Sequence, residues 1–150
     1  MGEANLTAAQ IISHTQRLED ESAALYRKLA EQAGANAPLF LAAAEESEKL
    51  KVNIVRTYQE TVSDALETGY SFAGLRLEDF AMEASTAEGA GLKDGVRHAM
   101  EMEAKTVAFY EEVAQRSENL LATIPGAFRR AARKREARRK QLEALLPSLK

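Results

Sequence analysis

Cysteine is absent from the 150 residues of this sequence. Its absence excludes disulfide bonds, thiolate zinc sites, iron–sulfur clusters and a cysteine nucleophile. It agrees with a reducing compartment, so we predict a cytoplasmic protein. No apolar run approaches the roughly 20 residues of a membrane span, and residues 1–5 lack the basic and apolar parts of a signal peptide. We therefore predict that no membrane is involved.

Residues that favour strands are also sparse. Ala, Leu, Glu, Lys and Arg dominate the composition, which is typical of an all-α protein. The length suits a single domain, 1–150, with a sizeable core. The sequence contains no Gly-rich phosphate loop, no Ser/His/Asp set and no nucleotide-binding motif. We therefore predict no catalytic residues.

Cap and turn signals divide the sequence into four predicted helices. A capping box begins at Thr7, and Gly34 follows the end of the first helix. Between 68 and 91, Gly, Ser and Thr are frequent, which predicts a long connection carrying a short helix at 75–82. The pattern predicts two helical hairpins joined by this long crossover, a four-helix bundle. The predicted helices span about 7–32, 37–67, 92–116 and 124–146.

The first predicted helix carries an acid, Glu19, on its inward face. Steps of three and four residues define that face. At an offset of 84 positions the pattern recurs, with Glu103 in place of Glu19 and Tyr110 in place of Tyr26. A buried carboxylate needs a cation, a metal or a proton. The two inward faces are Ile12, Thr15, Glu19, Ser22, Tyr26, Leu29 and Val96, Ala99, Glu103, Thr106, Tyr110, Val113.

The pattern Arg-Leu-Glu-x-Glu-x-x-x-x-Tyr-x-x-Leu at 17–29, with its second copy at 102–113, resembles the rubrerythrin branch of the ferritin-like superfamily. The resemblance covers almost the whole chain. It implies a ferritin-like bundle and, because this family commonly forms dimers, a homo-oligomer. Such proteins hold two metal ions with one Glu from each of two helices and a Glu-x-x-His pair from each of the other two. Glu19 and Glu103 match the single-Glu positions.

The second predicted helix lacks its Glu-x-x-His pair. The frame set by Phe40 places Ser47 and Leu50 at these positions, and a frame shifted by one places Glu48 and Lys51 there. We prefer the first frame because the second would bury two acids. Neither frame supplies a histidine.

The fourth predicted helix has Arg135 and Arg138 where the second Glu-x-x-His pair is expected. Two glutamates cannot build a two-metal site, and a nearby arginine would repel the ions. We therefore expect no metal and no cofactor. Planar arginine side chains suit buried carboxylates. We predict that Arg135 and Arg138 form a buried ion-pair cluster with Glu19 and Glu103.

Two tyrosines and two histidines also recur in the repeat. We predict that Tyr26 and Tyr110 are core residues whose rings pack and whose hydroxyls bond a carboxylate. His14 and His98 each lie five residues before a glutamate, about 140° around the helix. We predict that both histidines lie at the surface.

The sequence leaves two classes of function open. The leading hypothesis is a rubrerythrin-like protein that has lost its di-iron centre and acts as a non-catalytic structural or interaction module. The competing hypothesis is an iron-binding oxidoreductase of peroxidase or ferroxidase type. Its variant site would bind di-iron or di-manganese through Glu19, Glu103 and Glu48.

The fourth predicted helix is strongly basic. Between 129 and 140 it has eight Lys or Arg against one Glu, a local +7 in a chain of net charge −3. A weaker third hypothesis is that this helix binds a polyanion. The alternative is a solvated helix beside exposed acids at Glu45, Glu46, Glu111 and Glu112. Because aromatics are not interleaved and no base-reading motif is present, we do not expect nucleic-acid binding.

Overall fold

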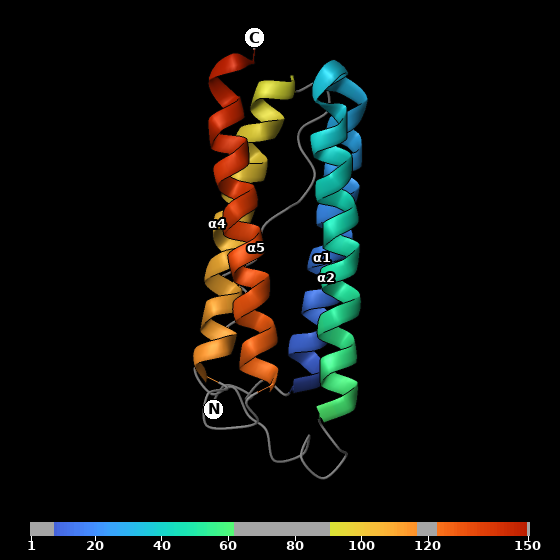
Figure 1. Cartoon of the computed structure of the whole chain (residues 1–150), viewed down its shortest axis with the longest axis vertical. Helices are drawn as coiled ribbons and strands as arrows, with labels where there is room; N and C mark the ends of the chain where they lie inside the picture. The colour runs from blue at the N-terminus through green and yellow to red at the C-terminus, as the bar shows by residue number, and fades with distance from the viewer. Residues whose placement is uncertain (1–7, 62–90, 117–122, 150) are drawn as a thin grey trace, which may run out of the picture.

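The computed structural model describes residues 8–61, 91–116 and 123–149, which are helical with almost no exception. The described residues form four long helices, which lie side by side along one axis (Figure 1). Two short 3-10 turns, η1 (Gly34–Asn36) and η3 (Leu146–Ser148), follow α1 and α5. The all-α class predicted from composition is confirmed. The long helices are α1 (Ala8–Gln32), α2 (Ala37–Thr61), α4 (Leu92–Arg116) and α5 (Thr123–Leu145).

Helix ends follow the local signals in the sequence. Gly34, with φ of 54°, adopts the left-handed conformation after the end of α1, where a residue without a Cβ carries no steric penalty. Pro38 lies in the first turn of α2, where its missing N–H costs no helical hydrogen bond. The predicted capping residue Thr7, the end of the second helix past 61 and the short helix at 75–82 lie outside the described residues.

The helices pack as two hairpins. α1 packs along α2, and α4 packs along α5. Figure 1 shows that α2 and α4 run in the same direction, so the end of α2 and the start of α4 lie at opposite ends of the bundle. α1 runs antiparallel to α4, and α2 runs antiparallel to α5. The two antiparallel pairs bring equivalent positions of the repeat face to face.

The interior consists of two apolar clusters with a polar layer between them. One cluster includes Ile11, Phe109 and Phe128, and the other includes Leu29 and Phe40. Such clusters supply the hydrophobic driving force, roughly 25 cal/mol for each Å² buried. The buried polar side chains are Thr15, Glu19, Ser22, Ser47, Glu103, Thr106, Arg135 and Arg138.

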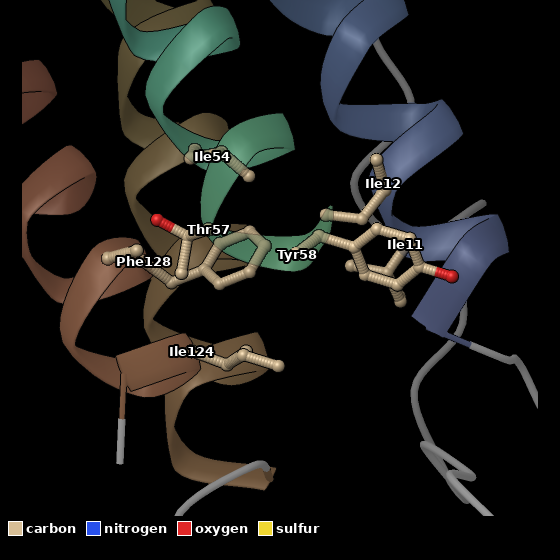
Figure 2. Close-up of a pocket in the computed structure, with 8 residues that line it drawn as sticks. Ile11, Ile12, Ile54, Thr57, Tyr58, Ile124 and Phe128 are labelled. Atoms are coloured by element: carbon tan, nitrogen blue, oxygen red, sulfur yellow. The ribbon is translucent and has the colours of Figure 1, made fainter. Parts of the chain in front are cut away.

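A small apolar pocket lies near the start of α1. Side chains of α1, α2 and α5, including Ile12, Tyr58 and Ile124, converge around it (Figure 2). Its volume is about 10 Å³, close to the minimum for one water molecule, and an apolar lining of this kind gives water few partners. This pocket is a packing feature and not a ligand site. No described helix combines the length and apolar character that a membrane span needs.

Candidate functional site

Glu19 of α1 and Glu103 of α4 are both fully buried, at 0% exposure. Each lies on the inward face of its helix, and the apolar residues before and after it on that face hold the acid at the bundle axis. Removing a carboxylate from water costs several kcal/mol unless nearby charges and donors compensate. The groups that surround these two glutamates therefore define the site.

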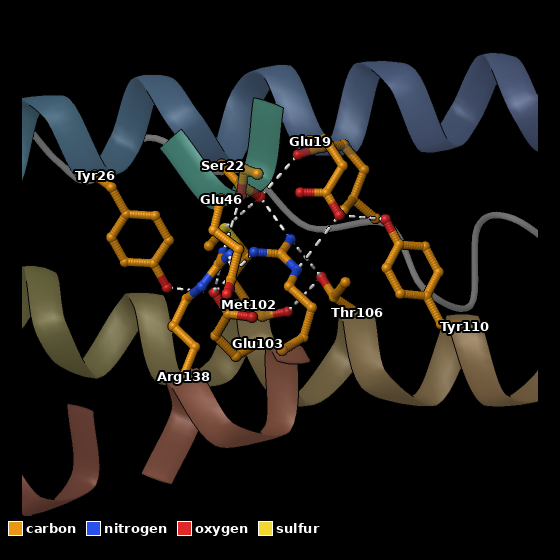
Figure 3. A network of polar contacts seen from close by, with 12 residues as sticks. Glu19, Ser22, Tyr26, Glu46, Met102, Glu103, Thr106, Tyr110 and Arg138 are labelled. Carbon is orange, nitrogen blue, oxygen red and sulfur yellow. Dashed lines mark hydrogen bonds and ion pairs between the residues drawn. The ribbon is translucent and has the colours of Figure 1, made fainter. Parts of the chain in front are cut away.

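Each glutamate accepts a hydrogen bond from the tyrosine of the other repeat (Figure 3). The Tyr26 hydroxyl donates to Glu103 Oε2, and the Tyr110 hydroxyl donates to Glu19 Oε2. A tyrosine seven residues after a glutamate lies about 10 Å farther along the same helix, beyond its reach. In the antiparallel pair α1 and α4, this equal spacing brings each tyrosine level with the opposite glutamate. The spacing of the repeat thus produces reciprocal Glu–Tyr pairs.

Arg135 of α5 links the two glutamates and is itself 0% exposed. Its Nη1 lies 2.8 Å from Glu103 Oε2, and its Nε lies 3.6 Å from Glu19 Oε2. Nη2 donates to the hydroxyls of Ser22 at 2.7 Å and Thr106 at 3.3 Å. Both hydroxyls donate to a carbonyl in the preceding turn, which leaves their lone pairs for the guanidinium.

Arg138 lies one turn further along α5 and also contacts Glu103. Its Nη1 lies 3.2 Å from Glu103 Oε2 and 2.9 Å from Ser47 Oγ. Its Nη2 lies 2.6 Å from Glu46 Oε1, at the edge of the bundle. The guanidinium carbon also lies 5.2 Å from the centre of the Tyr26 ring, within cation–π range. The fully buried charges, two carboxylates and two guanidiniums, therefore cancel.

Burial and charge shift the pKa values of these groups in consistent directions. Burial, followed by the charge of Glu103, raises the pKa of Tyr26 well above its ordinary value. Burial and then Glu19 do the same for the pKa of Tyr110. Burial by itself lowers the pKa of Arg135, but Glu103 and Glu19 outweigh it and raise that pKa overall. The tyrosines are thus held as neutral donors and Arg135 as a permanent cation.

The two glutamates are compensated unequally. Glu103 Oε2 accepts hydrogen bonds from Tyr26, Arg135 and Arg138. Glu19 Oε2 accepts one from Tyr110, since Arg135 Nε is an ion-pair contact at 3.6 Å. The Oε1 atoms of both glutamates have no hydrogen-bond partner among the described residues. Glu19 is therefore the more weakly satisfied acid.

This inequality predicts different costs for the two tyrosine hydroxyls. Tyr110→Phe removes the one hydrogen bond that Glu19 accepts from the described side chains and is expected to lower the free energy of unfolding by about 1–3 kcal/mol. Tyr26→Phe is expected to cost less, because Glu103 keeps both arginines and the Phe ring keeps its contact with Arg138. Urea denaturation of the two matched variants checks the order. A larger loss for Tyr26→Phe would contradict it.

The structure brings Glu19, Glu103, Arg135 and Arg138 into one network, and it adds a residue that sequence reasoning missed. Glu46 was assigned with Glu45 to the exposed acids, but it is half-buried and bonds Arg138. Its position next to the inward Ser47 was the available signal. The long side chain of Arg138 reaches it at the bundle edge.

The surface position predicted for His14 is only partly correct, because its side chain is half-buried. Its ring packs edge-on against Phe109, with 4.8 Å between ring centres. Its two ring nitrogens are buried without a hydrogen-bond partner among the described residues. Burial, followed by the charge of Arg17, lowers the pKa of His14. Its exposure is lower than predicted because α4 covers the flank of the inward face of α1 as well as the centre of that face. His98 is half-buried rather than fully exposed.

The donor set does not fit a two-metal centre. On α2 the inward positions are Ser47, at 0% exposure, and Leu50, at 4%, so the preferred frame holds. Glu48 lies at the surface, 2.8 Å from Arg27. Within the described ranges, no three His, Asp or Glu side chains gather in a way that would hold a metal ion. Arg135 would repel a cation placed between the two glutamates.

What the arrangement can do chemically follows from its groups. It contains two neutral phenols, two carboxylates and two guanidiniums that neutralise one another in a dry interior. Each phenol donates to a carboxylate, but the pKa of both tyrosines is raised, so the phenols are held in their protonated form. Comparisons with protein-family models, curated proteins and solved structures find no significant match to this chain.

Proposed function

We propose that this chain is a ferritin-like protein of rubrerythrin type in which arginine has replaced the metal centre, and that it acts as a non-catalytic structural or interaction module. The observation that carries the proposal is the contact of Arg135 with both Glu103, at 2.8 Å, and Glu19, at 3.6 Å. Glu19 and Glu103 are the two positions that match the family's single-Glu ligands. A guanidinium supplies there the positive charge that metal ions supply in that family.

The layout of the helices supports the same proposal. Two hairpins are related by the sequence repeat, and α2 and α4 run in the same direction (Figure 1). Arg135 and Arg138 are three residues apart on α5 and face inward, as a Glu-x-x-His pair would. Each former ligand position that has changed now carries a side chain that either takes part in a hydrogen bond of the cluster or packs apolarly.

The competing oxidoreductase hypothesis is disfavoured by Glu48. A variant metal site requires a third carboxylate near Glu19 and Glu103. Glu48 is half-exposed and pairs with Arg27 on the outside of the α1–α2 hairpin. No other acid among the described residues approaches the axis except Glu46, whose carboxylate is held by Arg138.

A cobalt titration of the purified protein tests the proposal. We expect no stoichiometric binding of Co²⁺, Fe²⁺ or Mn²⁺, because the two carboxylates are already neutralised. The matched comparison is the double variant Glu19→Gln/Glu103→Gln, which is expected to show the same weak surface binding. One or two tightly held ions per chain that this variant loses would overturn the proposal. Sedimentation velocity of the same preparation checks the expected self-association.

A further inference from the structure

Three basic side chains line one groove between α2 and α5. They are Arg56 of α2 and Arg130 and Lys134 of α5, around a groove of about 200 Å³ whose lining includes no acidic residue. All three are exposed. None of them forms an ion pair within the described part of the chain. Like charges four residues apart on a helix, such as Arg130 and Lys134, repel each other. The groove is therefore an uncompensated positive site.

The opposite side of α5 shows that this excess of positive charge is confined to the groove between α2 and α5. The groove between α4 and α5 is also lined by basic residues, including Arg133, but there Glu111, Glu112 and Glu136 line it too. Arg139 is similarly shared between Glu136 and Glu143. The basic residues of α5 thus have acidic neighbours on the α4 side and none in the groove with α2.

The groove combines buried apolar side chains with exposed polar ones. Its floor is apolar and includes Ile54 and Ala131, while Asn53 adds a side-chain amide at its edge. Arg130 Nη1 lies 3.6 Å from where a Cβ on Gly126 would be, so its guanidinium extends back along α5 toward the first turn. The three cations and the amide all line this one groove.

We propose that this groove binds the phosphoryl group of a phosphorylated small molecule. Two guanidiniums offer planar, paired donors that match phosphoryl oxygens, and the lysine adds a point charge. The volume is below the roughly 300–1,000 Å³ of typical drug-sized pockets, so it suits a phosphoryl group with a small organic part lying on the apolar floor. A concave site of this size favours a small anion over an extended nucleic-acid backbone. The proposal does not depend on the buried cluster.

Titration with inorganic phosphate and with pyrophosphate at low salt, followed by calorimetry and amide NMR, tests the site. We expect saturable binding of one pyrophosphate per chain, amide shifts confined to α2 and α5, and an increase in Tm. Arg130→Gln and Lys134→Gln are each expected to weaken pyrophosphate binding about tenfold. The matched control is Arg133→Gln, which removes the same charge from the α4 side of the same helix. Its affinity is expected to change less than about twofold.

Two results would overturn the site. The first is the absence of saturable binding by either probe while the protein is folded by circular dichroism. The second is equal weakening by Arg133→Gln and Arg130→Gln, which would indicate attraction to net charge alone. A DNA duplex or vesicles containing phosphatidic acid serve as the comparison. Tighter binding of either one, weakened equally by both variants, counts against a small-molecule site.

Discussion

Replacing Arg135 with methionine is expected to lower the free energy of unfolding by about 3–5 kcal/mol. The change removes the ion-pair partner that Glu19 has within the described ranges, and it takes one of the donors from Glu103. Both carboxylates are 0% exposed, so water cannot replace the lost guanidinium without opening the core. Urea denaturation followed by helical circular dichroism measures the loss.

A control and a rescue isolate the charge effect from packing. Arg133→Met changes an exposed arginine on the same helix and is expected to stay within about 0.5 kcal/mol of the parent protein. Adding Glu19→Gln and Glu103→Gln to Arg135→Met removes the unpaired charges and is expected to recover more than half of the loss. Equal stability of Arg135→Met and Arg133→Met would show that the buried ion pairs are not required for folding.

Much of this cluster could be predicted because helical period and repeat act together. Glu19 and Glu103 occupy equivalent inward positions, and the frames of α2 and α5 follow from aromatic and small residues such as Phe40 and Phe128. With the frames known, Arg135 and Arg138 had to project toward the axis. Prediction succeeded here because each residue's direction depends only on its own helix.

The missed contacts depend on more than one helix. The crossed pairing of Tyr26 with Glu103, and of Tyr110 with Glu19, requires the relative direction and register of α1 and α4. The burial of His14 requires α4 to cover a flank of α1. The hydrophobic period of one helix shows neither how α1 and α4 are aligned nor how much of α1 is covered by α4. Sequence alone therefore predicted which residues point inward and that the arginines meet the glutamates, but not which tyrosine meets which glutamate.

The assignment of inward positions on α2 and α5 can be tested by rebuilding the complete ligand set of the family proposed for this chain. The variant Ser47→Glu/Leu50→His/Arg135→Glu/Arg138→His places a Glu-x-x-His pair on α2 and on α5. Each replaced side chain is at most 4% exposed, so all four new groups would project into the bundle beside Glu19 and Glu103. Four carboxylates and two histidines would then surround the axis, which is the ligand set of two-metal bundle proteins.

The expected result is a protein whose folding depends on metal. Without metal, the four buried carboxylates repel one another with no arginine between them, and the variant is expected to be largely unfolded at neutral pH. Because metal binds the folded state and not a preformed site in the unfolded chain, binding supplies folding free energy. Addition of Co²⁺ is expected to restore helical circular dichroism with a stoichiometry of two ions per chain.

The half-set variant Arg135→Glu/Arg138→His, which lacks the α2 pair, is the control and is expected to bind Co²⁺ more weakly. If the full set binds no more metal than the parent protein, Ser47 and Leu50 do not occupy the former ligand positions. The proposed loss of a metal centre could then no longer be assigned to these four residues, because the difference between a metal site and an ion-pair cluster in this bundle would lie elsewhere.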